Sequence, residues 1–550
     1  MYILGINSGV DNNTHDSAAA LLKDGQLICM VEQERISHRK RSVGEAPGDA
    51  IAACLSFANI TLADVEAVAL GWNINKVFSP LNEESIYKRL LSLEDTALNE
   101  IPTFHLISHS LSHAASAFWT SGFDKATILV IDGTGEAEST TTALGTHKDI
   151  QLLAEWDITQ SLGNFYTTAA EWVGFSIENV SQLTKLASYG QIAQNVPLRP
   201  TSTGYTFINS PIPHRRVYKH FSQQRAFLHR YFSSSNYPSY SNNRHSDPMI
   251  YTDFAASVQY ALEEAILQLA RVTCEQTKED RLVLAGEVAM NSKVNRRLAN
   301  SGLFKDLYVP PVPYDAGVSL GAALMVHHQL HQDSSVQPRM KHAYWAPGFS
   351  EKDFKRLLQS SGLTATWYHE FELVKKVAAY LNTGSLVAWV QGRAEVGQHA
   401  LGARSILGDP RQSAHSTRIN ELMESQTWLP VSTNVMEEYA ESILEQYPSS
   451  LTDFMMESCS IRTEMQQMIP AVTQVDGTTT PQIVCYRNNS RYWLLINAFR
   501  ELTGIPVLIN SPLSLAGEPI AYTPADALKI FCASQLDILV LDNYLIEKSK

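Results

Sequence analysis

The sequence predicts a chain of the α/β class, because strand and helix patterns alternate from its first residues. Residues 2–7 are apolar, and the segments AAALL and QLICMVE flank the turn Asp24-Gly25, which is a strong hairpin signal. Further along the chain we expect a helix over 47–58, a strand in VEAVALGW (65–72), a helix in ISHSLSHAASAF (107–118) and a strand in KATILVIDG (125–133). The chain therefore opens with a hairpin-led α/β unit.

A second unit with the same alternation of strand and helix patterns starts at Arg281. Its segments are LVLAGEVAMN, LYVPP, the turn Tyr314-Asp315-Ala316-Gly317 and the small-residue helix SLGAALMV. Each half thus has an acidic turn after an apolar strand. If the two halves face one another, Asp132 and Asp315 lie across one cleft.

Two segments depart from the alternation. Residues 196–250 are rich in Pro, Ser, Asn and Tyr and form either a solvated excursion or a wall of the acceptor pocket or an oligomer contact. Their basic residues include His214, Arg215, Arg216, Lys219, Arg225, Arg230 and Arg244. A polar, Pro-containing stretch places a linker at 336–348, between domains at 1–335 and 349–550. Apolar patterns such as WLLINAF and ALKIF indicate that the second domain folds.

Composition excludes several classes of protein. The 550 residues are 44% hydrophobic and carry a net charge of -13, which argues against a nucleic-acid binder. Six scattered cysteines without C-x2-C spacing are typical of reduced thiols. The start of the chain is a strand rather than a signal segment, and no apolar run reaches the length of a membrane span. We therefore expect a cytoplasmic protein without membrane or nucleic-acid partners.

The most informative feature is the pair His109 and His113. Residues four apart lie on one face of a helix, so both imidazoles can reach a single ion, and Asp132 at a strand end can add a carboxylate oxygen. His105 would extend the series by one more helical turn, beyond the reach of that ion, and is interpreted as structural. The adjacent turn with Gly133 and Gly135 favours transfer from a phosphorylated or adenylated donor.

The motifs HDSAAALL, EQERISHRK, the H-x3-H helix, IDGTGE, GEVAMN and PYDAG occur in this order, followed by GRAEVGQHALGARSILGDPR, IPAVTQVDGT and TGIPVLIN. Together they make the chain resemble the O-carbamoyltransferases that act on antibiotics and nodulation factors. The resemblance implies a two-lobed N-terminal domain of the actin and sugar-kinase superfamily. It also implies a C-terminal α/β domain like carbamoyl-adenylate synthases (YrdC-like).

By this resemblance, the second domain makes carbamoyl adenylate from carbamoyl phosphate and ATP, with Mg²⁺ as a further candidate ion, and the first passes the carbamoyl group to an acceptor hydroxyl. His109, His113, Asp132 and Asp315 match the positions that hold iron in the family. Two imidazoles and two carboxylates suit divalent iron, although zinc or manganese would also fit.

The resemblance also assigns roles to residues around the metal. His15 falls at a histidine that lines the acceptor site and is proposed as the general base; the alternative is a buried histidine paired with Asp16. Lys40 matches a basic position near the donor and could stabilise developing charge; the alternative is a solvated basic loop.

Nucleotide contacts are expected at two places. Gly286 and Asn291 match positions where backbone amides approach the nucleotide, but Glu287 stands where the family usually has glycine. A carboxylate beside a phosphate is unfavourable unless it turns away. In the second domain, Arg393 and Arg404 remain as candidate phosphate ligands, with Glu395, Arg411 and Asp476 able to complete a partial site.

Several basic positions of the second domain are altered. Residues expected to be basic in the family are here His399, Ser425, Leu429, Gln474 and Thr480, and Ser511-Pro512-Leu513-Ser514 replaces the usual N-T-S-F-N continuation. Each charge-assisted hydrogen bond to phosphate contributes roughly 1.5–3 kcal/mol, so losing three or four would weaken polyanion binding by orders of magnitude. Donor activation in this domain is therefore in question.

The leading hypothesis is a carbamoyltransferase of specialised metabolism, such as antibiotic biosynthesis, with carbamoyl phosphate and a hydroxylated small molecule as substrates. One rival is a family offshoot whose degenerate second domain leaves the first to catalyse another acyl transfer, condensation or hydrolysis. A second rival is a non-catalytic assembly subunit. A phosphotransferase is disfavoured because the second domain would have no role. The acceptor, the metal and homo-oligomerisation are left open.

Overall fold

The computed structural model describes residues 1–8, 10–11, 13–77, 83–92, 102–193, 195–208, 221–233, 247–331 and 337–548. Of the basic residues named above in the 196–250 segment, Arg225 and Arg230 lie on helix α8 (Phe221–Ser233). The others, His214, Arg215, Arg216, Lys219 and Arg244, lie outside the described residues. No helix in these ranges is long and apolar enough to cross a bilayer.

The chain divides into two compact units. The first comprises Met1–Gln33 and Arg41–Met340, and the second comprises Glu34–Lys40 and Lys341–Lys550. The change of unit at 340/341 falls inside the segment 336–348 that we interpreted as a linker. Residues 34–40 belong to the second unit, and nothing in the sequence pattern predicted this. The domain limits of 1–335 and 349–550 stay predictions.

The first sheet of unit 1 begins with the expected hairpin. Its order is β3-β2-β1-β4-β5, with the hairpin strands antiparallel and β1, β4 and β5 parallel. The bounds are β1 Tyr2–Asn7, β2 Ala18–Lys23, β3 Gln26–Glu32, β4 Ala67–Leu70 and β5 Thr103–Leu106. Asp24 and Gly25 both have positive φ, as a two-residue hairpin turn requires. Helix α2 (Gly48–Ala58) packs on β2 and β3.

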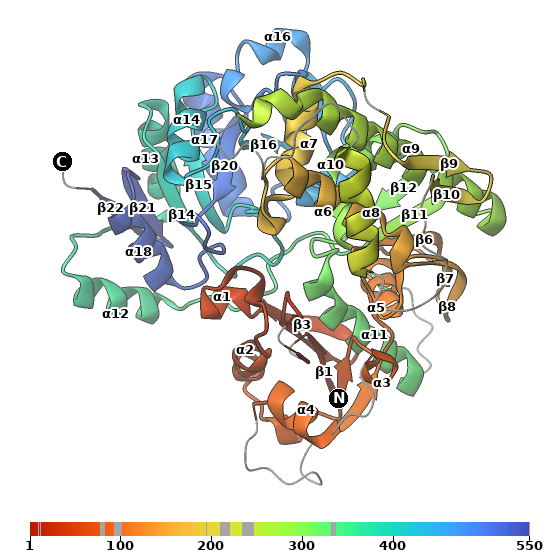
Figure 1. Ribbon diagram of the computed structural model, residues 1–550. Helices are drawn as coiled ribbons and strands as arrows, with labels where there is room; N and C mark the ends of the chain where they lie inside the picture. Colours follow the sequence, from red (N-terminus) through yellow and green to blue (C-terminus); the bar gives the residue numbers. More distant parts are fainter. Residues whose placement is uncertain are drawn as a thin grey trace. The chain divides into compact units, whose positions relative to one another are not determined.

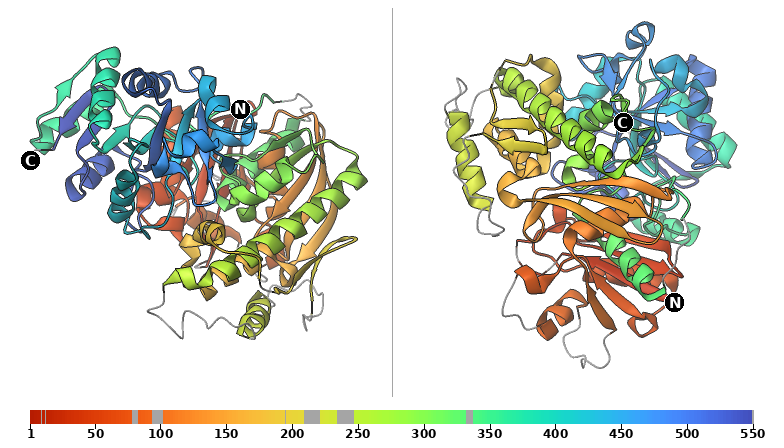
Figure 2. Two further views of the ribbon diagram at one scale, coloured as in Figure 1. Left: turned by 90° about the horizontal axis from the view of Figure 1, so that it is seen from above. Right: turned by 90° about the vertical axis from the view of Figure 1, so that its right-hand side faces the viewer.

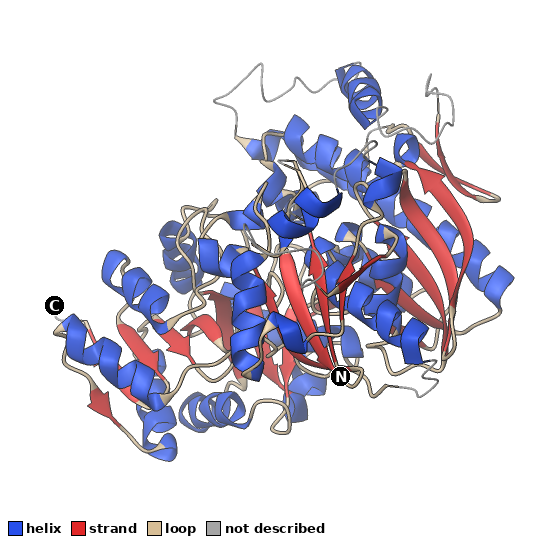
Figure 3. Ribbon diagram, turned by 90° about the horizontal axis from the view of Figure 1, so that it is seen from below, coloured by secondary structure: helices blue, strands red, loops and turns tan. Residues whose placement is uncertain are grey.

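The second sheet of unit 1 repeats this topology. Read as β8-β7-β6-β11-β12, it again has three antiparallel strands followed by two parallel ones. The bounds are β6 Lys125–Ile131, β7 Glu138–Thr146, β8 Ile150–Asp157, β11 Arg281–Ala285 and β12 Asp306–Tyr308. Figure 3 shows its long strands in red beside blue helices. The duplicated order agrees with the expected two-lobed α/β domain.

Two helices join the lobes of unit 1. Helix α5 (His109–Phe118) packs on the second sheet, α11 (Val318–His331) packs on the first, and the two contact each other. Gly321 permits this contact, because a Cβ there would lie 1.7 Å from the carbonyl oxygen of Ser112. The strands central to each sheet are apolar on both faces because helices cover them.

The remaining helices of unit 1 follow the second sheet. Their bounds are α6 Leu162–Trp172, α7 Ser181–Leu186, α9 Thr252–Thr277 and α10 Ser292–Ala299, and the hairpin β9 (Leu198–Thr201) and β10 (Gly204–Phe207) packs on α9. Short helices α3 (Ile74–Val77) and α4 (Glu83–Leu90) follow β4. Figure 2 shows α9, in yellow-green, lying along the orange strands of the sheet. The 26-residue helix α9 was not anticipated from the sequence.

Unit 2 is built on a mixed sheet of order β13-β22-β21-β14-β15-β20-β16-β19. The strands are β13 Thr366–Trp367, β14 Val387–Val390, β15 Arg404–Gly408, β16 Ser432–Met436, β19 Pro481–Val484, β20 Val507–Pro512, β21 Ile538–Leu541 and β22 Tyr544–Glu547. The main helices, labelled in Figure 1, are α12 Glu351–Ser361, α13 Glu370–Asn382, α14 Ser413–Leu422, α17 Ser490–Thr503 and α18 Pro524–Ala533. The smaller elements are α1 Glu34–Ser37, α15 Ala440–Ile443, α16 Thr463–Gln466, β17 Cys459–Ser460 and β18 Thr478–Thr479.

The apolar segments WLLINAF and ALKIF lie on α17 and α18, and both helices contribute side chains to one core with the sheet strands. Trp389 is its largest fully buried residue. Arg35, from the segment Glu34–Lys40, donates to the carbonyl oxygens of Gly397 and Ile520 within the same unit. The likeness of this unit to carbamoyl-adenylate synthases stays a prediction. Its α/β class agrees with the expected fold.

Candidate metal centre

Helix α5 presents both histidines of the H-x3-H pair to one point. It begins at His109, and the side chains of His109 and His113 are both fully buried. His105 precedes the helix and lies on β5, so the three histidines do not form one helical series as the spacing suggested. The i, i+4 spacing brings the two Nε2 atoms within 3.2 Å of each other.

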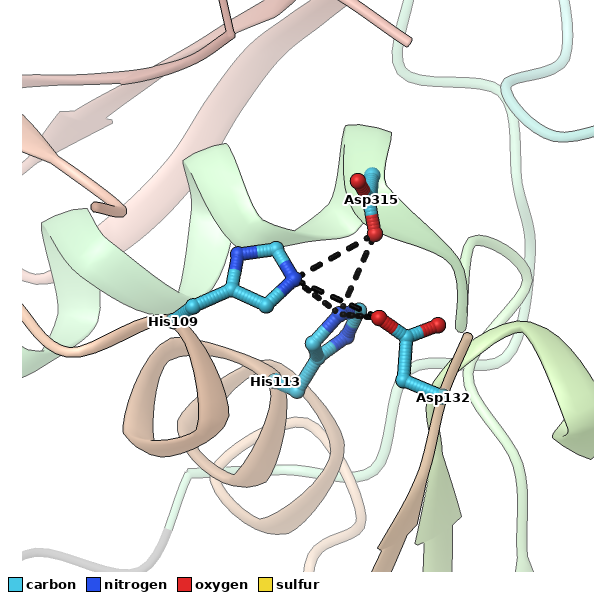
Figure 4. Close-up of side chains that lie close together, drawn as sticks. All are labelled: His109, His113, Asp132 and Asp315. Carbon is cyan, nitrogen blue, oxygen red and sulfur yellow. Dashed lines mark hydrogen bonds and ion pairs between the residues drawn. The ribbon is translucent and has the colours of Figure 1, made fainter. Parts of the chain in front are cut away.

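Two carboxylates complete the group, and they follow two strands of the second sheet, β6 and β12. Asp132 follows β6, and Asp315 opens a short 3-10 helix (Asp315–Gly317) that leads into α11. His109 Nε2 lies 3.4 Å from Asp132 Oδ2 and 3.4 Å from Asp315 Oδ1. His113 Nε2 lies 3.7 and 3.4 Å from the same two oxygens. Figure 4 shows the four side chains pointing at one another.

This donor set fits a divalent metal ion. An ion about 2.1 Å from each ligand atom would set neighbouring ligands about 3.4 Å apart in a tetrahedron and about 3.0 Å apart in an octahedron. The closest nitrogen-to-nitrogen and nitrogen-to-oxygen distances here are 3.2–3.7 Å, and all four ligand atoms lie within 4.8 Å of one another. The two buried carboxylates supply the negative charge that a buried cation needs.

Without a metal, the same four groups behave as buried ion pairs. Burial lowers the pKa of His109 and His113, but Asp132 and Asp315 outweigh it and hold both pKa values above the ordinary 6.5. Burial raises the pKa of each aspartate, and the imidazoles outweigh it, so that both carboxyl pKa values lie below their ordinary range. A metal ion would take the place of the imidazole protons.

Groups around the cluster fix its ligands. His109 Nδ1 lies 3.3 Å from the carbonyl oxygen of Gly71, which orients Nε2 toward the aspartates, and the indole of Trp72 packs against the His109 ring at 4.1 Å between centroids. The second oxygen of Asp132 accepts the N–H of Glu287 at 3.0 Å. Gly71, Trp72 and Glu287 carried no sequence signal for this role.

His15 lies next to the cluster and is paired with Asp16. Its Nδ1 is 2.8 Å from Asp16 Oδ2 and 3.7 Å from Asp315 Oδ2, and its side chain is 31% exposed. Burial and Arg41 lower the His15 pKa, but Asp16 and Asp315 outweigh them and raise it. The short contact to Asp16 favours a proton on Nδ1, which leaves Nε2 as an acceptor. The structure shows the expected pairing of His15 with Asp16, and the role of His15 as general base stays a prediction.

The last two residues of the basic run His38-Arg39-Lys40-Arg41 belong to different units. Lys40 is half-buried and belongs to unit 2, whereas the cluster belongs to unit 1. Its role near the donor stays a prediction. Arg41 belongs to unit 1 and donates from Nη2 to Asp16 Oδ2 at 2.9 Å. Sequence reasoning missed Arg41, because nothing in the run tells which basic side chain turns inward.

The expected nucleotide contacts of unit 1 are tied into the fold. Gly286 has φ of 87° and donates its N–H to Pro313, and the N–H of Asn291 goes to Val288. The Asn291 side chain caps α10. Gly133 accepts from Ser161 Oγ through its carbonyl oxygen at 2.7 Å. Gly135 donates its N–H to the carbonyl oxygen of Glu138 at 2.7 Å. Nucleotide binding by Gly133, Gly135, Gly286 and Asn291 stays a prediction.

In unit 2, the two candidate arginines contact backbone carbonyls. Arg404 is 1% exposed and donates to the carbonyl oxygens of Tyr522, Gln391, Ala403 and Gly392. Burial lowers its pKa to about 10. Arg393 is half-buried and donates to the carbonyls of Trp345 and Ala346. These contacts hold Arg404 as part of the core of the unit rather than at an open surface.

Glu395 organises the loop that precedes β15. Its Oε1 accepts the backbone N–H groups of Leu401, Ala403 and Arg404 at 2.7, 3.3 and 3.2 Å. Arg411 pairs with Asp409 at 2.6 Å, and Asp476 accepts within its own turn from Thr478. The charged residues that remained in this unit therefore have structural partners. Gln474 and Thr480, at altered positions, are buried.

Comparison with known proteins finds one family match within each unit. Residues 72–324 match the family model described as carbamoyltransferase N-terminus, and residues 378–548 match the one described as carbamoyltransferase C-terminus. The chain belongs to the carbamoyltransferase family. It is 33% identical to "Nodulation protein NolNO" of Sinorhizobium fredii over all of this chain and 83% of that protein. It is 31% identical to "Nodulation protein NolO" of Bradyrhizobium diazoefficiens over 80% of this chain and 79% of that protein.

Membership of the carbamoyltransferase family confirms the resemblance drawn from the ordered motifs and makes the chain a transferase. The N-terminal carbamoyltransferase match ends beyond Asp315, so it contains all four residues of the cluster. The C-terminal match contains Arg393 and Arg404.

Proposed function

We propose that this carbamoyltransferase passes a carbamoyl group to a hydroxyl of a small-molecule acceptor beside a divalent metal. His109, His113, Asp132 and Asp315 would hold the ion. The observation that carries the proposal is the convergence of these four buried side chains from three distant segments. Two nitrogens and two oxygens favour divalent iron, with zinc or manganese as alternatives.

The bound metal would supply Lewis-acid stabilisation of the charge that develops on the carbamoyl oxygen. The other groups act on the acceptor. His15 Nε2 takes the proton of the acceptor hydroxyl while the hydroxyl oxygen bonds to the carbamoyl carbon. The bond from that carbon to the phosphate oxygen of the donor breaks, and the nucleotide leaves with the electron pair. Asp16 holds the imidazole in the tautomer that makes Nε2 the acceptor and stabilises its charged form.

On the donor side, we propose that unit 2 forms carbamoyl adenylate from carbamoyl phosphate, water and Mg²⁺-ATP. Water cleaves the phosphorus–oxygen bond of carbamoyl phosphate and releases phosphate, and the resulting carbamate bonds to the α-phosphorus of ATP while pyrophosphate leaves. Arg393, which is only partly buried, would be a phosphate ligand of this unit. The acceptor is proposed to be a hydroxylated natural product, and a cytoplasmic location goes with these substrates.

A second candidate function has its own support. The guanidinium of Arg404 donates hydrogen bonds to four backbone carbonyl oxygens. Gln474 and Thr480 occupy positions where the resemblance implies basic side chains. In this alternative, unit 2 no longer activates the donor, and unit 1 transfers a carbamoyl or related acyl group from a donor made elsewhere.

One experiment tests both. The purified full chain is loaded with iron and incubated with ATP, Mg²⁺ and ¹⁴C-labelled carbamoyl phosphate, and pyrophosphate release and label transfer to a panel of polyhydroxylated acceptors are measured. Pyrophosphate with transfer supports the first function. Transfer only when carbamoyl adenylate is supplied supports the second. No transfer in either case, with metal bound, contradicts both.

A further inference from the structure

Arg41 lies between two carboxylates beside the metal cluster. Its Nη2 is 2.9 Å from Asp16 Oδ2 and 3.3 Å from Glu287 Oε1. The backbone around it is unusual, because Arg41 and Asp16 have φ of 61° and 56°, a region that side chains with a Cβ rarely adopt. The N–H of Asp16 donates to the carbonyl oxygen of Arg41, so the two strained residues hold each other.

The two ion pairs of Arg41 differ in burial. Asp16 is 4% exposed and accepts hydrogen bonds from both Nε and Nη2 of Arg41. Glu287 is 35% exposed and lies 3.3 Å from Arg41 Nη2. A buried, doubly hydrogen-bonded pair persists, whereas a half-exposed pair competes with water and with other anions. Asp16 is therefore the permanent partner of Arg41, and Glu287 is the exchangeable one.

The position of Glu287 is fixed at the cluster by its backbone. Its N–H donates to the metal-facing residue Asp132, and the preceding Gly286 cannot carry a Cβ, which would lie 2.3 Å from the carbonyl oxygen of Ile131. The Glu287 carboxylate also lies close to Gly133 in the turn after β6, since a Cβ at Gly133 would lie 3.8 Å from Glu287 Oε2. The carboxylate thus covers the cluster from the side where Arg41 lies.

We propose that Glu287 is an internal substitute for the anionic group of the donor, and that the phosphate of the donor displaces it from Arg41. Arg41 is then the specificity-determining residue for a phosphate-bearing donor, and this rests on the proposed function. A guanidinium with an exchangeable carboxylate offers a bidentate fork to phosphate, which binds it more strongly than a half-exposed carboxylate does. A neutral donor cannot displace Glu287, so the site discriminates by charge.

The test uses the full iron-loaded chain and inorganic phosphate as the probe, titrated calorimetrically at low salt. Glu287→Gln is expected to bind phosphate about tenfold more tightly than the natural chain, and Arg41→Lys about tenfold more weakly. In the double variant the gain from Glu287→Gln disappears. Arg297 and Glu264 form a matched pair away from the cluster, at 2.7 Å with 48% and 28% exposure, so Glu264→Gln is the control for the same change in net charge.

Phosphate binding that is equal in Glu287→Gln and Glu264→Gln overturns the proposal, as does a gain that persists in the Arg41→Lys background. Binding unaffected by Arg41→Lys assigns the phosphate to the metal alone and overturns it too. Should Arg41→Lys lose its metal or its fold, the comparison of Glu287→Gln with Glu264→Gln still decides.

The proposed function fails separately. Tighter phosphate binding in Glu287→Gln without any carbamoyl transfer by the natural chain supports the role of Arg41 and contradicts the transfer reaction. Carbamoyl transfer whose KM for the donor is equal in the natural chain and in Glu287→Gln supports the reaction and contradicts the exchange.

Discussion

The carboxylate of Glu136 accepts the backbone N–H of His109 at 3.1 Å. The same oxygen accepts the N–H of Asn73 at 2.7 Å, and Glu136 itself is buried. The first N–H groups of a helix have no partner within the helix, and a negative charge there is favourable. Glu136, four residues after Asp132, therefore holds the start of the helix that carries both imidazoles.

Replacing Glu136 with alanine removes an acceptor from two backbone donors. We expect Glu136→Ala to lower the free energy of unfolding by roughly 1–3 kcal/mol and to weaken metal binding by about 10–100-fold, as loss of an outer contact does. Glu136→Gln keeps an acceptor oxygen and should retain most of the affinity. Metal titration and melting temperature measure both effects.

The exposed partner of Glu136 gives the control. Lys76 contacts Glu136 at 3.3 Å and is 60% exposed, so Lys76→Met should change metal affinity little. If Lys76→Met and Glu136→Ala weaken metal binding equally, the ion pair between Lys76 and Glu136 sets the metal affinity, and the hydrogen bond from Glu136 to the start of α5 does not.

His113→Ala should abolish stoichiometric metal binding, because it removes one of four converging ligands. The chain should stay folded, because the other buried side chains of the helix, which are His109, Phe118, alanines and serines, are unchanged. The measurement is metal content by mass spectrometry after dialysis, with circular dichroism to check the fold. His105→Ala is the matched control, since His105 lies on β5 outside the cluster. Unchanged metal in His113→Ala would contradict the ligand assignment.

Metal affinity should rise with pH. In the folded chain the pKa values of His109 and His113 lie above 6.5. At a pH below these pKa values the metal ion must displace protons from the imidazoles, so its apparent affinity falls. The fall is up to about two log units per pH unit if both imidazoles are protonated. Calorimetry in two buffers of different ionisation enthalpy counts the protons released. An affinity that does not change from pH 6 to pH 8 would contradict this.

The metal-free chain should show the opposite trend. A raised histidine pKa contributes stability that is present below the unfolded value of 6.5 and is lost as pH rises through the folded pKa. A depressed aspartate pKa contributes stability present above 3.8 and lost as pH falls through the folded pKa. The metal-free melting temperature should therefore be highest in mildly acidic solution, and the gain from metal should grow toward pH 8.

The four residues of the cluster could be predicted from the sequence because their spacing and their places after strands follow local rules. Helical spacing joins His109 to His113, and the acidic turns after β6 and β12 meet because these strands run parallel in one sheet and end at the same edge. Asp132 and Asp315 were expected across one cleft because the segment from Arg281 was interpreted as a second half. The structure brings the two aspartates together, but β11 and β12 belong to the same sheet as β6, so that reason was wrong.

The surroundings of the cluster were not predictable in the same way. The basic run directed attention to Lys40, but the positive φ of Arg41 turns this residue toward Asp16, and no local pattern reports the sign of φ for an arginine. Arg404 looked like a phosphate ligand by resemblance. Its four carbonyl partners come from segments as distant as Gln391 and Tyr522, which only the folded chain brings together.

Arg404 gives the last prediction. Because its guanidinium satisfies four buried carbonyl groups, Arg404→Lys leaves several of them without a donor, and each buried unsatisfied group costs about 1–3 kcal/mol. We expect a fall of at least about 5 °C in the melting temperature, given roughly 2–4 °C per kcal/mol for a unit of this size. Arg393→Lys is the control, since Arg393 is half-buried and should cost less. A stable Arg404→Lys chain that has lost only pyrophosphate release would instead make Arg404 a ligand of the nucleotide.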